Sequence, residues 1–202
     1  MSLREIRACY DNDGVWVYQA YKPEIVAAAL EKGTFSTGFN LERMTWIKPS
    51  FGWMLYRSGF ASKHRQTAIL KIKVCHEGFQ EILGLAEMTS YDRARFESED
   101  AWQRALKHSK VRVQWDPDRT LRLHKLERRA IQIGVRGEVV RRYVNEWILD
   151  MVEVTKLAVA CGEAAKRQVE APPVPEERVY TVDASIRARL RMDLPEAEQV
   201  HA

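Results

Sequence analysis

One short segment of the sequence, residues 43–59, concentrates aromatic, basic and hydroxyl side chains; it reads RMTWIKPSFGWMLYRSG. Pro49 and Ser50 predict the start of a helix, because proline suits the first helical turn and a serine hydroxyl caps its free N–H groups. Those N–H groups and the helix dipole favour a bound anion, and Lys48 stands beside them. The alternative is structural: the aromatic side chains fill the core, Ser50 only caps the helix, and Arg57 pairs with a surface acid.

A second group of polar side chains stands where a predicted strand ends. Gln114, Asp116 and Arg119 are candidate substrate-binding residues, because strand ends and the loops after them often present binding groups. Residues 116–119 read DPDR, and an aspartate followed by proline is typical of a β-turn. A turn without any ligand is therefore the alternative interpretation of the same residues.

The positive charge of the chain is unevenly distributed. The formal net charge is +4, but residues 104–142 hold twelve lysines or arginines and only four acids. If this stretch folds onto one face, it would attract the phosphates of a nucleic acid or of a dinucleotide. The alternative is a solvated surface on which arginine stems cover apolar neighbours.

Composition and missing motifs exclude several classes of protein. With 202 residues and 46% hydrophobic side chains the chain can bury one substantial core, and its apolar runs are too short to span a membrane. The first residues hold no apolar signal segment, so we expect a cytoplasmic protein. Three widely spaced cysteines favour reduced thiols over a disulfide framework or a zinc site. The common metalloprotease, P-loop and serine-hydrolase motifs do not occur.

The elements that would position these side chains begin with a repeated unit. Residues 14–21 are rich in β-branched and aromatic side chains and predict a strand. Pro23 and Gly33 are the expected start and stop of a following helix. Residues 44–47 then predict a second strand, and residues 49–59 a second helix that Gly59 closes. The chain therefore opens as strand, helix, strand, helix.

The remaining pattern completes an α+β fold. The expected elements are a strand at 67–75, helices at 78–85 and 99–107, and strands at 111–115 and 130–133. Apolar residues spaced three and four apart predict one long amphipathic helix from Gly137 to about Gln168. We therefore expect a mixed or antiparallel sheet of about five strands, flanked by helices, with one long C-terminal helix.

Proline marks the expected end of the main domain. Residues 172–175 contain three prolines, and all six tryptophans precede them. Proline favours an extended backbone, and the lack of tryptophan afterwards leaves less to bury. We predict a single α+β domain at 1–169, followed at 170–202 by a Pro-rich linker and a C-terminal tail able to pack back onto the body.

Five stretches of the sequence resemble a microbial family of domains of unknown function, family 4291. They are REIRA at 4–8, VYQAY at 17–21, the segment at 43–59, VRVQWDPDR at 111–119 and IQIGVRGE at 131–138. The resemblance covers residues 4–155, leaves the tail after Glu170 outside, and implies no activity of its own.

The order of the opening elements also resembles ADP-ribosyltransferase folds. It consists of a strand ending in YQAY, a helix ending in GTF, Arg43, and then the second strand and helix. This resemblance implies an enzyme that uses NAD as substrate and transfers ADP-ribose, with nucleic acid as one acceptor. In that reaction a carboxylate stabilises the developing oxocarbenium ion, an aromatic ring stacks on nicotinamide and cations hold the pyrophosphate.

The same resemblance suggests which residues would take part. Gln19 stands where the family carries a histidine or arginine by the ribose, and Glu138 is the first choice for the later carboxylate, with Gln132 as second choice. The expected catalytic residues are Gln19, Arg43 and Glu138. The expected cofactor-binding residues are Tyr18, Tyr21, Trp46, Lys48, Ser50, Arg57 and Gln132. For Glu138 the alternative is a carboxylate that only complements a helix dipole.

Three functions follow from these patterns. The leading one is a soluble nucleotide-handling enzyme that resembles the ADP-ribosyltransferases and binds a dinucleotide. The alternative is a non-enzymatic nucleic-acid-binding module with a basic and aromatic surface. The third is an interaction domain that uses the long helix after Gly137 as a dimer face. The first requires Gln19, Arg43, Trp46 and Glu138 to meet in one cleft.

Overall fold

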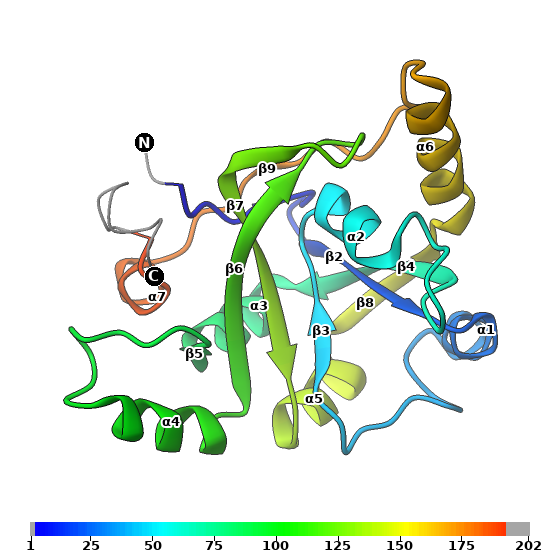
Figure 1. Ribbon diagram of the computed structural model, residues 1–202. Helices are drawn as coiled ribbons and strands as arrows, with labels where there is room; N and C mark the ends of the chain where they lie inside the picture. Colours follow the sequence, from blue (N-terminus) through cyan, green and yellow to red (C-terminus); the bar gives the residue numbers. More distant parts are fainter. Residues whose placement is uncertain (1–2, 193–202) are drawn as a thin grey trace.

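The computed structural model describes residues 3–192 and has an α+β fold, as the sequence predicts (Figure 1). The strands form three sheets instead of one. The first contains β2 (Gly14–Tyr21), β4 (Ala68–Cys75) and β8 (Ile148–Glu153), with β4 in the centre and all pairs antiparallel. The second contains β3 (Thr45–Ile47), β7 (Lys125–Val135), β6 (Val111–Arg119) and β5 (Ala86–Met88), in that order, with only β5 and β6 parallel.

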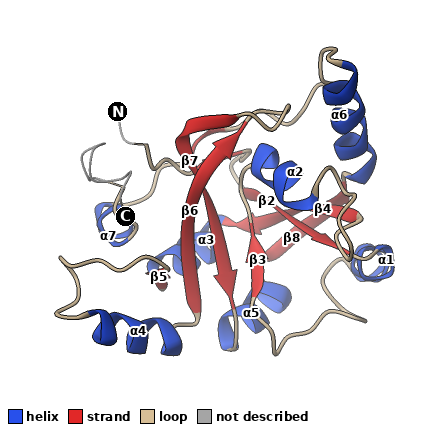
Figure 2. Cartoon of the chain, in the orientation of Figure 1, coloured by secondary structure: helices blue, strands red, loops and turns tan. Residues whose placement is uncertain are grey.

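The third sheet is a short pair that joins distant parts of the chain, β1 (Arg7–Ala8) and β9 (Arg178–Val179). The helices are α1 (Pro23–Lys32), α2 (Phe51–Ser58), α3 (His76–Gly84), α4 (Glu99–His108), α5 (Glu138–Arg142), the π-helix η1 (Tyr143–Trp147), α6 (Thr155–Arg167) and α7 (Ala184–Arg189). Figure 2 shows these helices around the outside of the two larger sheets, whose strands run in different directions.

The opening strand–helix–strand–helix unit forms as its local signals predict. Helix α1 begins at Pro23 and ends at Gly33, whose φ of 74° lies in the left-handed region that glycine tolerates. Helix α2 begins after Ser50, whose hydroxyl accepts a hydrogen bond from the Trp53 N–H, and ends at Gly59 with φ 58°. Both helices are therefore delimited by the residues that stand immediately beside them.

The turn predicted at residues 116–119 is wrong, because these residues complete strand β6. The chain reverses at residues 120–124 instead, where Leu123 N–H donates to Thr120 O at 2.8 Å. Pro117 lies next to a shift in the register between β6 and β7. A proline without an N–H is tolerated at such an irregularity, so the strand can run through it.

The long helix predicted from Gly137 to Gln168 is also wrong. That stretch forms α5, then η1, then strand β8, and only then α6. Strand β8 pairs with β4 over residues 148–153, and Met151 is its buried side chain. The apolar residues spaced three and four apart are therefore divided between two short helical segments and strand β8. Pairing with β4 outweighs the helical pattern at residues 148–153.

One backbone bridge connects the two larger sheets. Tyr18 of β2 and Lys48, directly after β3, exchange hydrogen bonds: Tyr18 N–H donates to Lys48 O at 2.7 Å, and Lys48 N–H donates to Tyr18 O at 3.1 Å. On the second sheet, Ile47, Val113 and Ile133 point into the main core and are fully buried. Because side chains alternate along a strand, the neighbouring positions face the other way.

Residues beyond the predicted boundary at Val169 contribute to the main core. Tyr180, Val182, Ile186 and Leu190 are buried among its hydrophobic side chains. Trp115 of β6 donates from Nε1 to Leu190 O at 3.1 Å. In the part of the chain that the structure describes, no helix is long and apolar enough to cross a membrane.

Two glycines of α3 provide a matched test of how closely this helix packs against Trp147 of η1. A Cβ atom at Gly78 would lie 2.3 Å from Trp147 Cγ, whereas nothing lies within 4 Å of the same atom at Gly84. We expect Gly78→Ala to lower the free energy of unfolding by about 2 kcal/mol or more, because the indole cannot move without disturbing the core. Gly84→Ala should leave it unchanged or raise it by up to about 1 kcal/mol. Urea unfolding measures both, and equal effects would contradict the packing.

Candidate functional site

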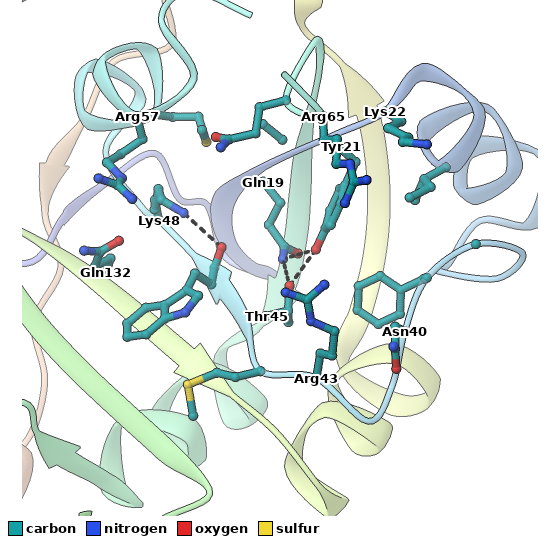
Figure 3. A pocket seen from close by; sticks show the side chains of 18 of the residues that line it. Gln19, Tyr21, Lys22, Asn40, Arg43, Thr45, Lys48, Arg57, Arg65 and Gln132 are labelled. Atoms are coloured by element: carbon teal, nitrogen blue, oxygen red, sulfur yellow. Dashed lines mark hydrogen bonds between the residues drawn. The ribbon is translucent and has the colours of Figure 1, made fainter. Parts of the chain in front are cut away.

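A cleft with a volume of about 1030 Å³ lies where the two larger sheets meet. Residues from β2 and β3 line it, together with the loop before β3 and the loop after α2. Figure 3 shows Lys48 and Arg57 at one end, Lys22 and Asn40 at the other, and Gln19 between them. This size is at the upper end of ordinary ligand pockets and suits a molecule larger than a single sugar or base.

The floor of the cleft is a closed hydrogen-bond network around Gln19. Gln19 Nε2 donates to Tyr21 Oη at 2.7 Å and to Thr45 Oγ1 at 2.6 Å, and Tyr143 Oη donates to Gln19 Oε1 at 2.8 Å. The hydroxyls of Tyr21 and Thr45 also lie 2.5 Å apart. Burial raises the pKa of the Tyr21 phenol far above its usual range. Both amide hydrogens of Gln19 are therefore already used, and the network joins β2 to β3 at the floor of the cleft.

One wall is the outward face of the second sheet. Trp46 pairs with Gly134 and Gln114 with Gln132, so the side chains of these three polar or aromatic residues share one face. A Cβ at Gly134 would lie 3.1 Å from Trp46 Cε2 and 2.6 Å from Met44 Sδ. The missing side chain at Gly134 therefore lets the indole of Trp46 lie against the strand beside the cleft.

Asp116 lies beside Gln114 and Gln132 on the same face of the second sheet. Gln114 Nε2 donates to Asp116 Oδ1 at 3.0 Å, and Gln132 Nε2 donates to Asp116 Oδ2 at 2.8 Å. Burial raises the pKa of the Asp116 carboxyl, and the two amide donors oppose that change. Both glutamines line the cleft while Asp116 does not, so Asp116 fixes their orientation.

Lys48 is a buried cation at one end of the cleft. Its exposed fraction is 7%, and its Nζ donates to Trp46 O at 3.1 Å. Burial and the nearby charge of Arg57 lower the pKa of the Lys48 amine from 10.5 to about 7, while Asp116 acts in the opposite direction. At neutral pH a large fraction of this amine is therefore uncharged.

The rim of the cleft is strongly basic. Arg43, Arg57 and Arg65 are exposed and line it, and none of them forms an ion pair within residues 3–192. Among the residues of 3–192 that line the cleft, Glu24 is the one acid. Its Oε1 lies 3.3 Å from Lys22 Nζ, with which it forms an ion pair. Cationic side chains without carboxylate partners attract anions, and guanidinium groups bind phosphates with two parallel hydrogen bonds.

Sequence patterns did not indicate Arg65 or Thr45 as site residues. Arg65 lies in the loop after α2, where Gly59, Phe60, Ala61 and Arg65 itself all have positive φ values. Nothing in the local sequence indicates that this loop turns back over the cleft. Thr45 was part of a predicted strand, and only the approach of β2 gives it a role beside Gln19.

The structure brings together eight of the sequence candidates and separates five. Those that line the cleft are Gln19, Tyr21, Arg43, Trp46, Lys48, Arg57, Gln114 and Gln132. Glu138 does not: it is exposed at the start of α5, with its carboxylate 3.4 Å from Lys110 Nζ. The expectation that Glu138 meets Gln19, Arg43 and Trp46 in one cleft is therefore wrong, because α5 places this carboxylate beside Lys110 instead.

The anion seat predicted at Ser50 is occupied by the protein's own carboxylates. Ser50 Oγ donates to Asp118 Oδ1 at 3.1 Å, and Phe51 N–H donates to Glu177 Oε1 at 2.5 Å. Burial raises the pKa of Glu177 to about 7. Tyr18 packs against Phe51 with ring centroids 5.0 Å apart, so it is a core residue. The start of α2 is therefore an internal contact rather than a ligand site.

Arg119 lies outside the cleft as well. Its guanidinium carbon stands 4.2 Å from the centroid of the Tyr56 ring, and its Nη1 donates to Leu123 O at 3.3 Å. Other arginines of the basic stretch at 104–142 are also bound locally: Arg128 pairs with Asp118 at 2.8 Å, and Arg142 pairs with Glu81 and Glu146. From this stretch only Gln114 and Gln132 appear among the described lining residues. The stretch therefore does not build the basic cleft.

Comparisons with known proteins give a family and no activity. A family model described as Domain of unknown function (DUF4291) matches residues 5–180, which include the Pro-rich segment and β9. No curated protein matches the chain. Among residues 3–192 no three histidine, cysteine, aspartate or glutamate side chains are grouped so that they could hold a metal ion.

The buried Lys48 amine predicts an unusual dependence of stability on pH. Below about pH 7 the folded state holds a charged ammonium in a buried site, whereas the unfolded lysine stays charged up to about pH 10. The free energy of unfolding should therefore rise between these values, by on the order of 3 kcal/mol. Lys48→Met should be more stable than the wild type at neutral pH and lack this rise in urea unfolding. Lys71→Met, which removes a lysine outside the cleft, should keep it; a rise that persists in Lys48→Met would contradict the assignment.

Proposed function

The chain belongs to this family of domains of unknown function, and from the cleft itself we propose that it binds a nucleotide through the phosphates. The observation that carries the proposal is the set of arginines on the rim, Arg43, Arg57 and Arg65, none of which forms an ion pair among the described residues. Three such groups around one cleft suit a ligand with several negative charges.

The rest of the cleft fits the other parts of a nucleotide. Trp46 offers an aromatic face on which a base or a nicotinamide ring can stack. Gln114 and Gln132, oriented by Asp116, offer amide oxygens and are placed to accept hydrogen bonds from a base or ribose. The volume of about 1030 Å³ has room for a dinucleotide. NAD, which the resemblance to ADP-ribosyltransferases implies, is accordingly the candidate ligand.

Transfer of ADP-ribose is the reaction that this resemblance adds to the proposal. It needs a carboxylate beside the ribose to stabilise the oxocarbenium ion. Glu138 lies elsewhere, and Glu24, the acid in the described lining, is exposed and paired with Lys22. Binding is therefore what the geometry supports best, and release of nicotinamide is a separate outcome to be measured.

Calorimetric titration with NAD tests the proposal. We expect the wild type to bind NAD and expect Arg57→Ala and Arg65→Ala each to weaken binding about tenfold, because each removes a charged partner of the phosphates. Arg104→Ala, an exposed arginine of α4 outside the cleft, should bind as the wild type does. Absence of NAD binding by the wild type would remove the dinucleotide proposal.

Salt separates the proposal from the non-enzymatic nucleic-acid-binding alternative. A protein that tracks a nucleic-acid backbone loses affinity steeply with added salt, by about one power of the salt concentration per phosphate contact. A dinucleotide offers only two phosphates to the rim arginines. NAD affinity should therefore fall mildly, and a steep loss for an oligonucleotide with no NAD binding would favour the alternative.

A further inference from the structure

Lys48 has features that phosphate binding alone does not explain. Its side chain is 7% exposed, whereas the three arginines that line the same cleft are exposed. Its Nζ donates to a backbone carbonyl, Trp46 O, and within residues 3–192 it has no carboxylate partner in an ion pair. A lysine that served only to attract phosphate would be better placed on the rim, where water keeps it charged.

Burial and two charged neighbours of Lys48 set its protonation. Arg57 of α2 is a like charge and disfavours the ammonium, while Asp116 of β6 is the nearby acid and favours it. Figure 3 shows Arg57 next to Lys48, with Gln132 of β7 on the same side of the cleft. Burial, with a smaller contribution from the charge of Arg57, lowers the pKa of Lys48 to about 7, so that both the free amine and the ammonium are present under ordinary conditions.

We propose that the Lys48 amine captures the carbonyl carbon of an aldehyde-bearing phosphorylated ligand as an imine, with the phosphate held by the rim arginines. The inference rests on the proposed function, because the same cationic cleft has to hold the phosphate. It narrows the ligand to a class: an open-chain sugar phosphate, or a nucleotide whose terminal ribose opens to an aldehyde. NAD itself has no free aldehyde and could compete for the cleft without reacting.

The step balances without a further reactant. The nitrogen lone pair of the free amine adds to the carbonyl carbon, and one proton passes from that nitrogen to the carbonyl oxygen, directly or through water, to give a carbinolamine. The carbinolamine then loses its hydroxyl and a nitrogen-bound hydrogen as one water molecule, which leaves a carbon–nitrogen double bond. Nothing is oxidised or reduced. The open cleft supplies and removes the water, and Asp116 is the nearby negative charge that would favour the protonated imine.

Position in the cleft gives Lys48 an advantage over other lysines. An ordinary exposed lysine is in its free amine form in only about one molecule in a thousand at neutral pH, whereas an amine with a pKa of about 7 is about half free. An amine with a lower pKa is also a weaker nucleophile, and this offsets part of the advantage that Lys48 has from its larger free-amine fraction. We therefore expect Lys48 to react at least about tenfold faster than an exposed lysine such as Lys63.

Pyridoxal 5′-phosphate, an aldehyde that carries a phosphate, is a suitable probe. The full chain is incubated with the probe, the imine is reduced with borohydride, and the adduct is located by peptide mass spectrometry. We expect the adduct on Lys48, its loss in Lys48→Arg, which keeps the charge, and its retention in Lys71→Arg. Excess NAD should reduce labelling, and Arg65→Ala should slow labelling by pyridoxal 5′-phosphate but not by pyridoxal, which has no phosphate.

The possible results separate this inference from the proposed function. Labelling spread over exposed lysines, or unchanged in Lys48→Arg, overturns the inference, while NAD binding in calorimetry still supports the proposed function. NAD can fail to bind while Lys48 is labelled equally by pyridoxal and its phosphate. That result would support a reactive Lys48 amine and contradict the phosphate site of both proposals. The adduct is mapped in the wild type. The location of the label therefore tests the inference even if a variant fails to fold.

Discussion

The cleft depends on one pair of backbone hydrogen bonds, the bridge between Tyr18 and Lys48. These two bonds, at 2.7 and 3.1 Å, are the point at which a strand of the first sheet meets the second sheet. Because they fix the two backbones side by side, Gln19 and Tyr21 reach Thr45 on one side of the bridge. Trp46 and Lys48 lie on the outward face of the second sheet. The floor and one wall of the cleft therefore follow from a single contact between sheets.

The charged side chains near that bridge form two sets: carboxylates that bind within the protein, and arginines that form no ion pair within residues 3–192. The carboxylates of Asp118 and Glu177 serve the start of α2, where they satisfy Ser50 and the first free N–H group. The arginines of the rim receive no such partner from the described residues. Unpaired surface cations add little to folding stability. These arginines gather around a cleft whose floor is already satisfied by internal hydrogen bonds, and an external anion is the partner that we propose for them.

The sequence was informative where local signals decide the structure. Pro23, Gly33, Ser50 and Gly59 delimit the first two helices as expected, because caps and left-handed positions act on their immediate neighbours. The convergence of Gln19, Arg43 and Trp46 in one cleft was expected only from the resemblance to ADP-ribosyltransferase folds, because no local signal joins residues so far apart in the sequence. Strand β8 could not, because its apolar spacing also fits a helix and only pairing with β4 decides between them. Glu138 was misplaced for a related reason: chain order beside β7 does not say to which side α5 turns. Arg65 comes from a loop whose path no local pattern encodes.

The contact between Glu177 and the start of α2 has a consequence for the order of folding. It joins residues 126 positions apart, and the β1–β9 pair joins segments even farther apart in the chain. Contacts of such high contact order have a large loop-closure entropy and tend to be made late. During synthesis on the ribosome, the segment that carries Glu177 follows the strands of both larger sheets. The first N–H group of α2 therefore gains its carboxylate partner only after the segment that carries Glu177 has been synthesised.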